Sequence, residues 1–186
     1  MKLNKTIRYI GVDPGTNVLG YAVIEIVQKQ IRLVELDVLR MSKYDSPAAK
    51  LKAIFEGLQR IIIKYKPSEM AIEAPFYGKN VQSMLKLGRA QGVARAAAMT
   101  KGVEVTEYSP KRIKQAITGN GNATKEQVAA MLATLTSTKL DSYPLDATDA
   151  LATAVCHYFQ STSKLKGGKK YKGWEGFLKD NPNRVG

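Results

Sequence analysis

The chain has 186 residues and a formal net charge of +13, and 44% of its residues are hydrophobic and 24% charged. This length suits one domain with a core of its own, and the composition is that of a globular rather than a disordered protein. No apolar run approaches the length of a membrane span. The excess of positive charge favours a polyanionic partner, nucleic acid before a membrane surface.

The amino-terminal segment and the single cysteine bear on where the protein works. MKLNKTIRYIGVD runs from a short basic stretch directly into strand-like sequence, without the apolar stretch and cleavage site of a secretory leader. Cys156 has no partner for an intramolecular disulfide and lies in an Ala-rich apolar pattern typical of a buried thiol. We therefore expect a reducing, cytoplasmic compartment.

Three strands are predicted first, at residues 8–12, 19–27 and 31–39, with Gln28-Lys29-Gln30 as a hairpin turn between the last two. A helix follows, because Ser46-Pro47 supplies an N-cap and a first-turn proline before apolar residues recur at helical spacing. Residues 70–72 form the fourth predicted strand.

The second half of the chain alternates between helix and strand. Its predicted elements are a helix at 80–100, a strand at 103–108, an unassigned segment at 110–117, a helix from Thr124 and a last helix at 145–159. Gly88, Gly92 and Ala96 share one side of the first of these helices, which is explained equally well by close helix packing within the domain and by a dimer contact. The order predicts an α/β fold, a mixed sheet with helices on its faces.

The predicted domain covers residues 1–160, and the composition then changes to Ser, Lys and Gly. Residues 161–186 hold seven Lys or Arg and two acids, a net charge of 7 − 2 = +5, which predicts a basic, flexible tail.

Two acids stand where predicted strands end. Asp13 follows YIGV and Glu73 follows MAI, so each carboxylate comes directly after an apolar run. Burial of an unpaired carboxylate is costly, so each needs a partner or a cation. If the two strands are neighbours, the carboxylates lie side by side. Asp13 in DPGT alone allows three interpretations: a turn former, a phosphate-loop residue or a metal ligand.

Asp146 and Asp149 lie in the first turn of the last predicted helix, on or beside its apolar stripe. A purely structural explanation is equally good for this pair alone: Asp146 as an N-cap and Asp149 as a first-turn acid that complements the helix dipole. Together with Asp13 and Glu73, however, they form a set of four carboxylates suited to Mg²⁺ or Mn²⁺. Two such ions can activate water and stabilise the leaving oxygen of a phosphodiester.

Four strings carry a resemblance to a known family: IGVDPGT through Gly20-Tyr21, AIE with Phe76 and Gly78-Lys79-Asn80, LKLG at 85–88, and DATDALA at 146–152. In order and spacing they resemble the bacterial RuvC-type Holliday junction resolvases over roughly residues 7–160. The resemblance implies a ribonuclease H-like fold, a five-stranded mixed sheet flanked by helices on both faces.

The resemblance also implies what the residues do. A homodimer would bind a four-way DNA junction and nick two opposed strands, with Mg²⁺, or Mn²⁺ in its place, two ions per site. The catalytic and metal-binding acids would be Asp13, Glu73, Asp146 and Asp149, and the DNA-binding residues Phe76, Lys79, Asn80, Lys114 and Lys125. The RuvA–RuvB branch-migration complex would be a partner, and the enzyme would be nucleoid-associated.

Three rival functions remain to be weighed. Another ribonuclease H-like nuclease, acting on RNA or a different DNA structure, would use the same acids and differ around Phe76. A sugar-kinase or chaperone-type ATPase would need a second, duplicated domain, for which 186 residues are too few. A DNA-binding protein without catalysis is disfavoured by the presence of all four acids.

Overall fold

The computed structural model describes residues 6–75 and 80–165. Within these ranges one sheet holds five strands in the order β3-β2-β1-β4-β5. The strands are β1 (Ile7–Asp13), β2 (Val18–Val27), β3 (Gln30–Arg40), β4 (Glu69–Glu73) and β5 (Glu104–Tyr108). The first three strands pair antiparallel, while β4 runs parallel to both β1 and β5. The predicted mixed sheet is therefore confirmed.

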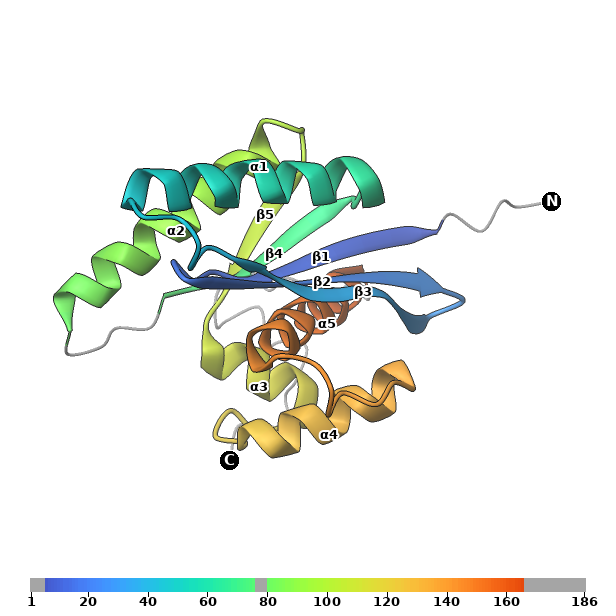
Figure 1. Cartoon of the computed structure of the whole chain (residues 1–186). Coiled ribbons are helices and arrows are strands. Elements are labelled where there is room, and N and C mark those ends of the chain that lie inside the picture. The colour runs from blue at the N-terminus through green and yellow to red at the C-terminus, as the bar shows by residue number, and fades with distance from the viewer. Residues whose placement is uncertain (1–5, 76–79, 166–186) are drawn as a thin grey trace, which may run out of the picture.

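Helices cover both faces of the sheet, as predicted (Figure 1). On one face lie α1 (Pro47–Tyr65) and α2 (Val81–Met99). On the other face α5 (Leu145–Leu165) packs directly on β1 and β2, and α3 (Pro110–Thr118) and α4 (Lys125–Thr136) pack outside it.

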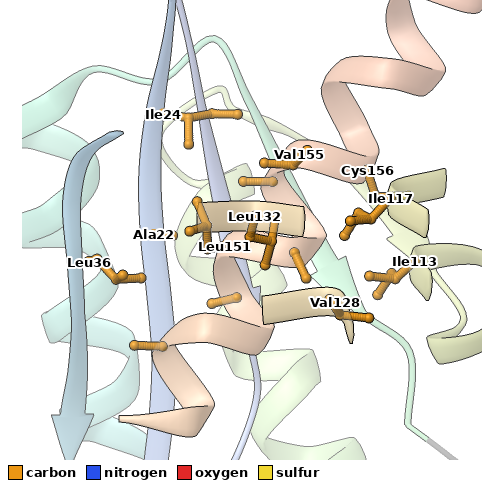
Figure 2. Packing of buried hydrophobic residues seen from close by; sticks show 14 of the residues in the cluster. Ala22, Ile24, Leu36, Ile113, Ile117, Val128, Leu132, Leu151, Val155 and Cys156 are labelled. Atoms are coloured by element: carbon orange, nitrogen blue, oxygen red, sulfur yellow. The ribbon is translucent and has the colours of Figure 1, made fainter. Parts of the chain in front are cut away.

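The sheet separates two apolar cores. The core beneath α5 includes small and branched side chains of β2, β3 and the three helices of that face (Figure 2). Cys156 is buried in it, as predicted for a structural thiol. The labelled members of this core are Ala22, Ile24, Leu36, Ile113, Ile117, Val128, Leu132, Leu151, Val155 and Cys156.

Local signals in the sequence explain how several elements begin. Ser46 caps α1, its hydroxyl accepting from the Ala49 N–H at 3.1 Å. The turn between β2 and β3 is confirmed: Gln28 and Lys29 have φ values of 49° and 68°, the left-handed pair that matches the twist of a tight hairpin.

The structure differs from the expectations in three places. The unassigned segment after β5 is the helix α3, whose start at Ser109-Pro110 repeats the cap and first-turn proline of α1. The last helix continues to Leu165 instead of ending at residue 159, and so crosses the expected boundary at residue 160. Residues 166–186 of the predicted tail lie outside the described residues.

The third difference concerns the acids of α5. This helix begins at Leu145, so Asp146 is inside its first turn rather than at the N-cap, and Asp149 comes after that turn. Within the described ranges, no helix is long and apolar enough to cross a membrane.

Candidate active site

Asp13 and Glu73 end adjacent strands. β1 and β4 are parallel neighbours, with Val12 opposite Ile72, so the next residue on each strand is the acid. The condition for placing the two carboxylates side by side is thus met. Both acids are half-buried, at the edge where the carboxyl ends of these strands meet.

Two glycines let α5 bring its acids to this edge. Gly20 pairs with Asp13 across β1 and β2, and a Cβ at Gly20 would collide with the backbone carbonyl of Asp146. A Cβ at Gly11 would collide in the same way with the carbonyl of Ala150. Helix backbone therefore lies directly on strand backbone, which holds the start of α5 beside Asp13. This role of the glycines was missed in the sequence, although both lie in the motif around Asp13.

The electrostatic environment disfavours ionised carboxylates here. Burial, followed by the charges of Glu73, Asp149 and Asp146, raises the pKa of Asp13 from 3.8 to about 8. Burial and the charge of Asp149 raise the pKa of Glu73 from 4.5 to about 7. The acids thus lie close enough to repel one another, and a cation placed among them would relieve that repulsion.

Lys125 is one of the cations that the protein itself supplies at this site. Its Nζ donates to Asp149 Oδ2 at 2.8 Å, and this hydrogen bond is the main cause of its raised pKa. Lys125 is the first residue of α4, where the helix dipole disfavours positive charge. The charge of Lys125 also lowers the pKa values of Asp13 and Glu73, so it partly offsets the repulsion at the site.

A small hollow lies beside Glu73, Asp149 and Lys125. Its volume is about 200 Å³, and Lys114 of α3 lines it together with acids from β4 and α5. The hollow is lined by Glu73, Pro110, Ile113, Lys114, Lys125, Val128, Asp149 and Ala152. Acids and lysines therefore share one opening, as a site for a phosphate and a divalent cation requires.

The chemistry of the donors fits a hard divalent cation better than any other group. Oxygen ligands suit Mg²⁺ and Mn²⁺. Among the described side chains, no three acid, histidine or cysteine groups converge on one cation position. Asp149 instead holds Lys125.

The remaining predicted DNA-binding residues differ in what the structure says of them. Phe76 and Lys79 lie outside the described residues. Asn80 is the N-cap of α2, its Oδ1 accepting from the Ser83 N–H at 3.1 Å. Lys114 and Lys125 both line the acid-containing hollow.

Comparison with known proteins identifies the family. Residues 9–157 match the family model of the crossover junction endodeoxyribonuclease RuvC. The curated RuvC of Cytophaga hutchinsonii is 56% identical over 178 residues, 95% of this chain and 86% of that protein. The curated RuvC of Porphyromonas gingivalis is 51% identical, with 95% of each chain covered.

Solved structures agree with the sequences. The structure of Thermus thermophilus RuvC is 30% identical with a TM-score of 0.79, covering 85% of this chain and 97% of that one. The same protein in complex with a Holliday junction substrate gives 28% identity and a TM-score of 0.76, with 84% and 96% covered. With the family model spanning both strand-end acids and the start of α5, this chain belongs to the RuvC family of crossover junction endodeoxyribonucleases.

Proposed function

We propose that this protein resolves four-way DNA junctions by Mg²⁺-dependent hydrolysis, with Asp13, Glu73, Asp146 and Asp149 as the metal-binding acids. The observation that carries the proposal is the pair of strand-end carboxylates whose pKa values are raised to about 8 and about 7 beside Asp149 and Lys125. Carboxylates held together at such a cost to their ionised forms favour binding of a divalent cation.

The acids and the lysines of the site have different proposed roles. Two bound Mg²⁺, or Mn²⁺ in their place, would supply Lewis acidity and an activated water. The four carboxylates would hold these ions in place and balance their positive charge. Lys114 and Lys125 lie beside the acids, where their ammonium groups bind the phosphate being cut and neutralise its charge.

Phe76, Lys79 and Asn80 are proposed to act on the junction itself. Phe76 follows Pro75 directly after the strand that ends at Glu73, so it comes only three residues after a proposed metal ligand. An aromatic ring in this place can stack on an unpaired base at the junction centre. Lys79 and Asn80 precede α2 and add polar contacts to the same DNA segment.

The proposed assembly is a homodimer through α2. The outer side of α2 carries Val81, Leu85 and Met99, which are 64%, 51% and 65% exposed. A Cβ at Gly88 or Gly92 would meet no described atom within 4 Å, so close packing inside the domain does not explain these small residues. The apolar stripe on α2 is Val81, Leu85, Gly88, Gly92, Ala96 and Met99.

The dimer is tested by its mass in solution. Leu85→Asp is expected to shift the protein from dimer to monomer in size-exclusion chromatography with light scattering. Ile63→Asp is the matched control, because Ile63 is 57% exposed on α1 and outside the stripe. A dimer that survives Leu85→Asp would move the interface elsewhere.

The activity is tested with a synthetic four-way junction. With Mg²⁺ the protein should nick it at symmetric positions and leave linear duplex intact. Equal cutting of linear duplex or of an RNA/DNA hybrid would favour the alternative, another ribonuclease H-like nuclease for RNA or a different DNA structure. Phe76→Ala should reduce cutting more than binding. Function on such DNA implies a nucleoid-associated protein of the bacterial cytoplasm, with the RuvA–RuvB complex as its partner in recombination and repair.

A further inference from the structure

A second basic hollow lies across the sheet edge from the acids, against α1 and α2. Its volume is about 350 Å³, and the cationic residues Lys50, Lys86 and Arg89 line it. Asp45 is the single carboxylate in its lining, which leaves a net charge of 3 − 1 = +2. Lys86 belongs to the LKLG motif, for which the proposed active site gives no function.

These positive charges exceed the single negative charge among the described residues that line the hollow. Among residues 6–75 and 80–165, no carboxylate lies within 4.0 Å of the cationic nitrogens of Lys50, Lys86 or Arg89. Lys50 instead donates to the amide oxygen of Asn17 at 2.7 Å, which fixes its ammonium group at the hollow. An anion that enters the hollow therefore does not have to break a salt bridge in order to bind these cations.

Backbone around the hollow adds to the attraction for an anion. Pro47, the first residue of the 19-residue helix α1, is in the lining, and the first turn of α1 contains no acid. The positive end of this helix dipole thus remains for a bound anion. The helix end supports the assignment, which the three cations and the hollow carry.

The hollow is close in sequence to the proposed metal site. Thr16 and Asn17 line it, and Asp13 lies three residues before Thr16. Three residues span at most ~11 Å even when fully extended. One DNA strand rises ~3.4 Å per nucleotide along the helix axis, so this maximum span corresponds to at most about three nucleotides.

We propose that this basic hollow binds a backbone phosphate of the junction strand that is being cut, within about three nucleotides of the scissile phosphate. The proposal rests on the proposed nuclease function and adds a second phosphate site to it. With one phosphate at Lys114 and Lys125 and another at Lys86 and Arg89, the strand would be held on both sides of Asp13.

The test compares two double variants that remove the same charge. Lys86→Ala/Arg89→Ala removes the two exposed cations of the hollow. The control, Arg60→Ala/Lys101→Ala, removes an arginine and a lysine, both exposed, from the later part of α1 and from just after α2. Lys86→Ala alone is a further variant, because Arg89 lies near the apolar stripe on α2.

Junction affinity and its salt dependence give the first result. Loss of the hollow's cations is expected to weaken binding about tenfold at ~0.1 M salt and to reduce the slope of log K against log salt by about one for each cation removed. The control should change both much less. Equal effects in the two double variants would mean that the hollow contributes only through the overall positive charge of the protein, and would overturn the proposal.

Neutral phosphates locate the contact. Single methylphosphonate groups placed along the cut strand should weaken wild-type binding at one position within about three nucleotides of the cut. That loss should vanish in Lys86→Ala and in the double variant, and its persistence there would overturn the proposal. Wild-type cutting of the unmodified junction is measured in parallel, so failure of the nuclease function itself would be seen separately.

Discussion

Asp13→Asn should stabilise the metal-free protein while abolishing junction cutting. The native pKa of Asp13 is about 8 against 3.8 ordinarily, so at pH 7 the folded protein keeps a proton that the unfolded chain has lost. Because the unfolded state binds fewer protons between these values, this group lowers stability as pH rises. The interval between the ordinary pKa of 3.8 and pH 7 is about 3 pH units. At ~1.4 kcal/mol per unit, the buried carboxyl group of Asp13 therefore lowers the free energy of unfolding at pH 7 by at most about 4 kcal/mol.

The net gain from the substitution should be smaller than this limit. The asparagine amide must still be accommodated in the same half-buried place, so we expect a net gain of about 2 kcal/mol at pH 7. For a chain of this size that corresponds to a rise in Tm of about 4–8 °C. The gain should be near zero at pH 4, grow as pH rises and level off above pH 8.

The assay is thermal unfolding in EDTA across this pH range, followed by the same scans with Mg²⁺. Asp141→Asn is the matched control, because Asp141 is exposed and does not line the hollow beside the acids. Mg²⁺ should raise the Tm of the wild type more than that of Asp13→Asn, because ligand binding stabilises the folded state that holds it. A lower Tm for Asp13→Asn in EDTA at pH 8, or a gain independent of pH, would refute a buried, repelled carboxylate at this position.

Two further substitutions test how the site is assembled. Gly20→Ala forces a Cβ onto the Asp146 carbonyl and should cost about 3 kcal/mol in urea unfolding, with loss of cutting; unchanged stability would contradict the close approach. Lys125→Met removes the ammonium that holds Asp149, so calorimetry at pH 8.5 should show Mn²⁺ binding several-fold tighter. Lys114→Met should gain less, and equal gains would indicate only a general charge effect.

The strands of the sheet were predictable because short local patterns in the sequence mark them. Apolar runs mark the strands, and the hairpin turn follows from the short polar break between two of them. Asp13 and Glu73 could be predicted as a pair only on the condition that their strands are neighbours, and the parallel pairing of β1 with β4 meets it. The sequence contains no direct mark of which strands pair.

The helix α3 shows a signal that was present but not used. Ser109-Pro110 has the same cap and first-turn proline as Ser46-Pro47, and Ser109 Oγ accepts from the Arg112 N–H at 3.3 Å. The helix is only nine residues long, too short for a periodic pattern to stand out. Its start signal was therefore a better guide than its apolar residues.

What the sequence could not supply was the contact that brings α5 to Asp13. That contact depends on two facts of tertiary structure: Gly20 stands opposite Asp13 in the antiparallel pairing, and the backbone of Asp146 lies on Gly20. A side chain at position 20 would push the helix away from the sheet and its acid away from the strand-end pair. The glycine of the motif thus sets the separation between carboxylates more than 130 residues apart in the chain, and so controls both their repulsion without metal and their ability to share a cation. Selection for the proposed metal site would therefore act on a residue that carries no chemistry of its own.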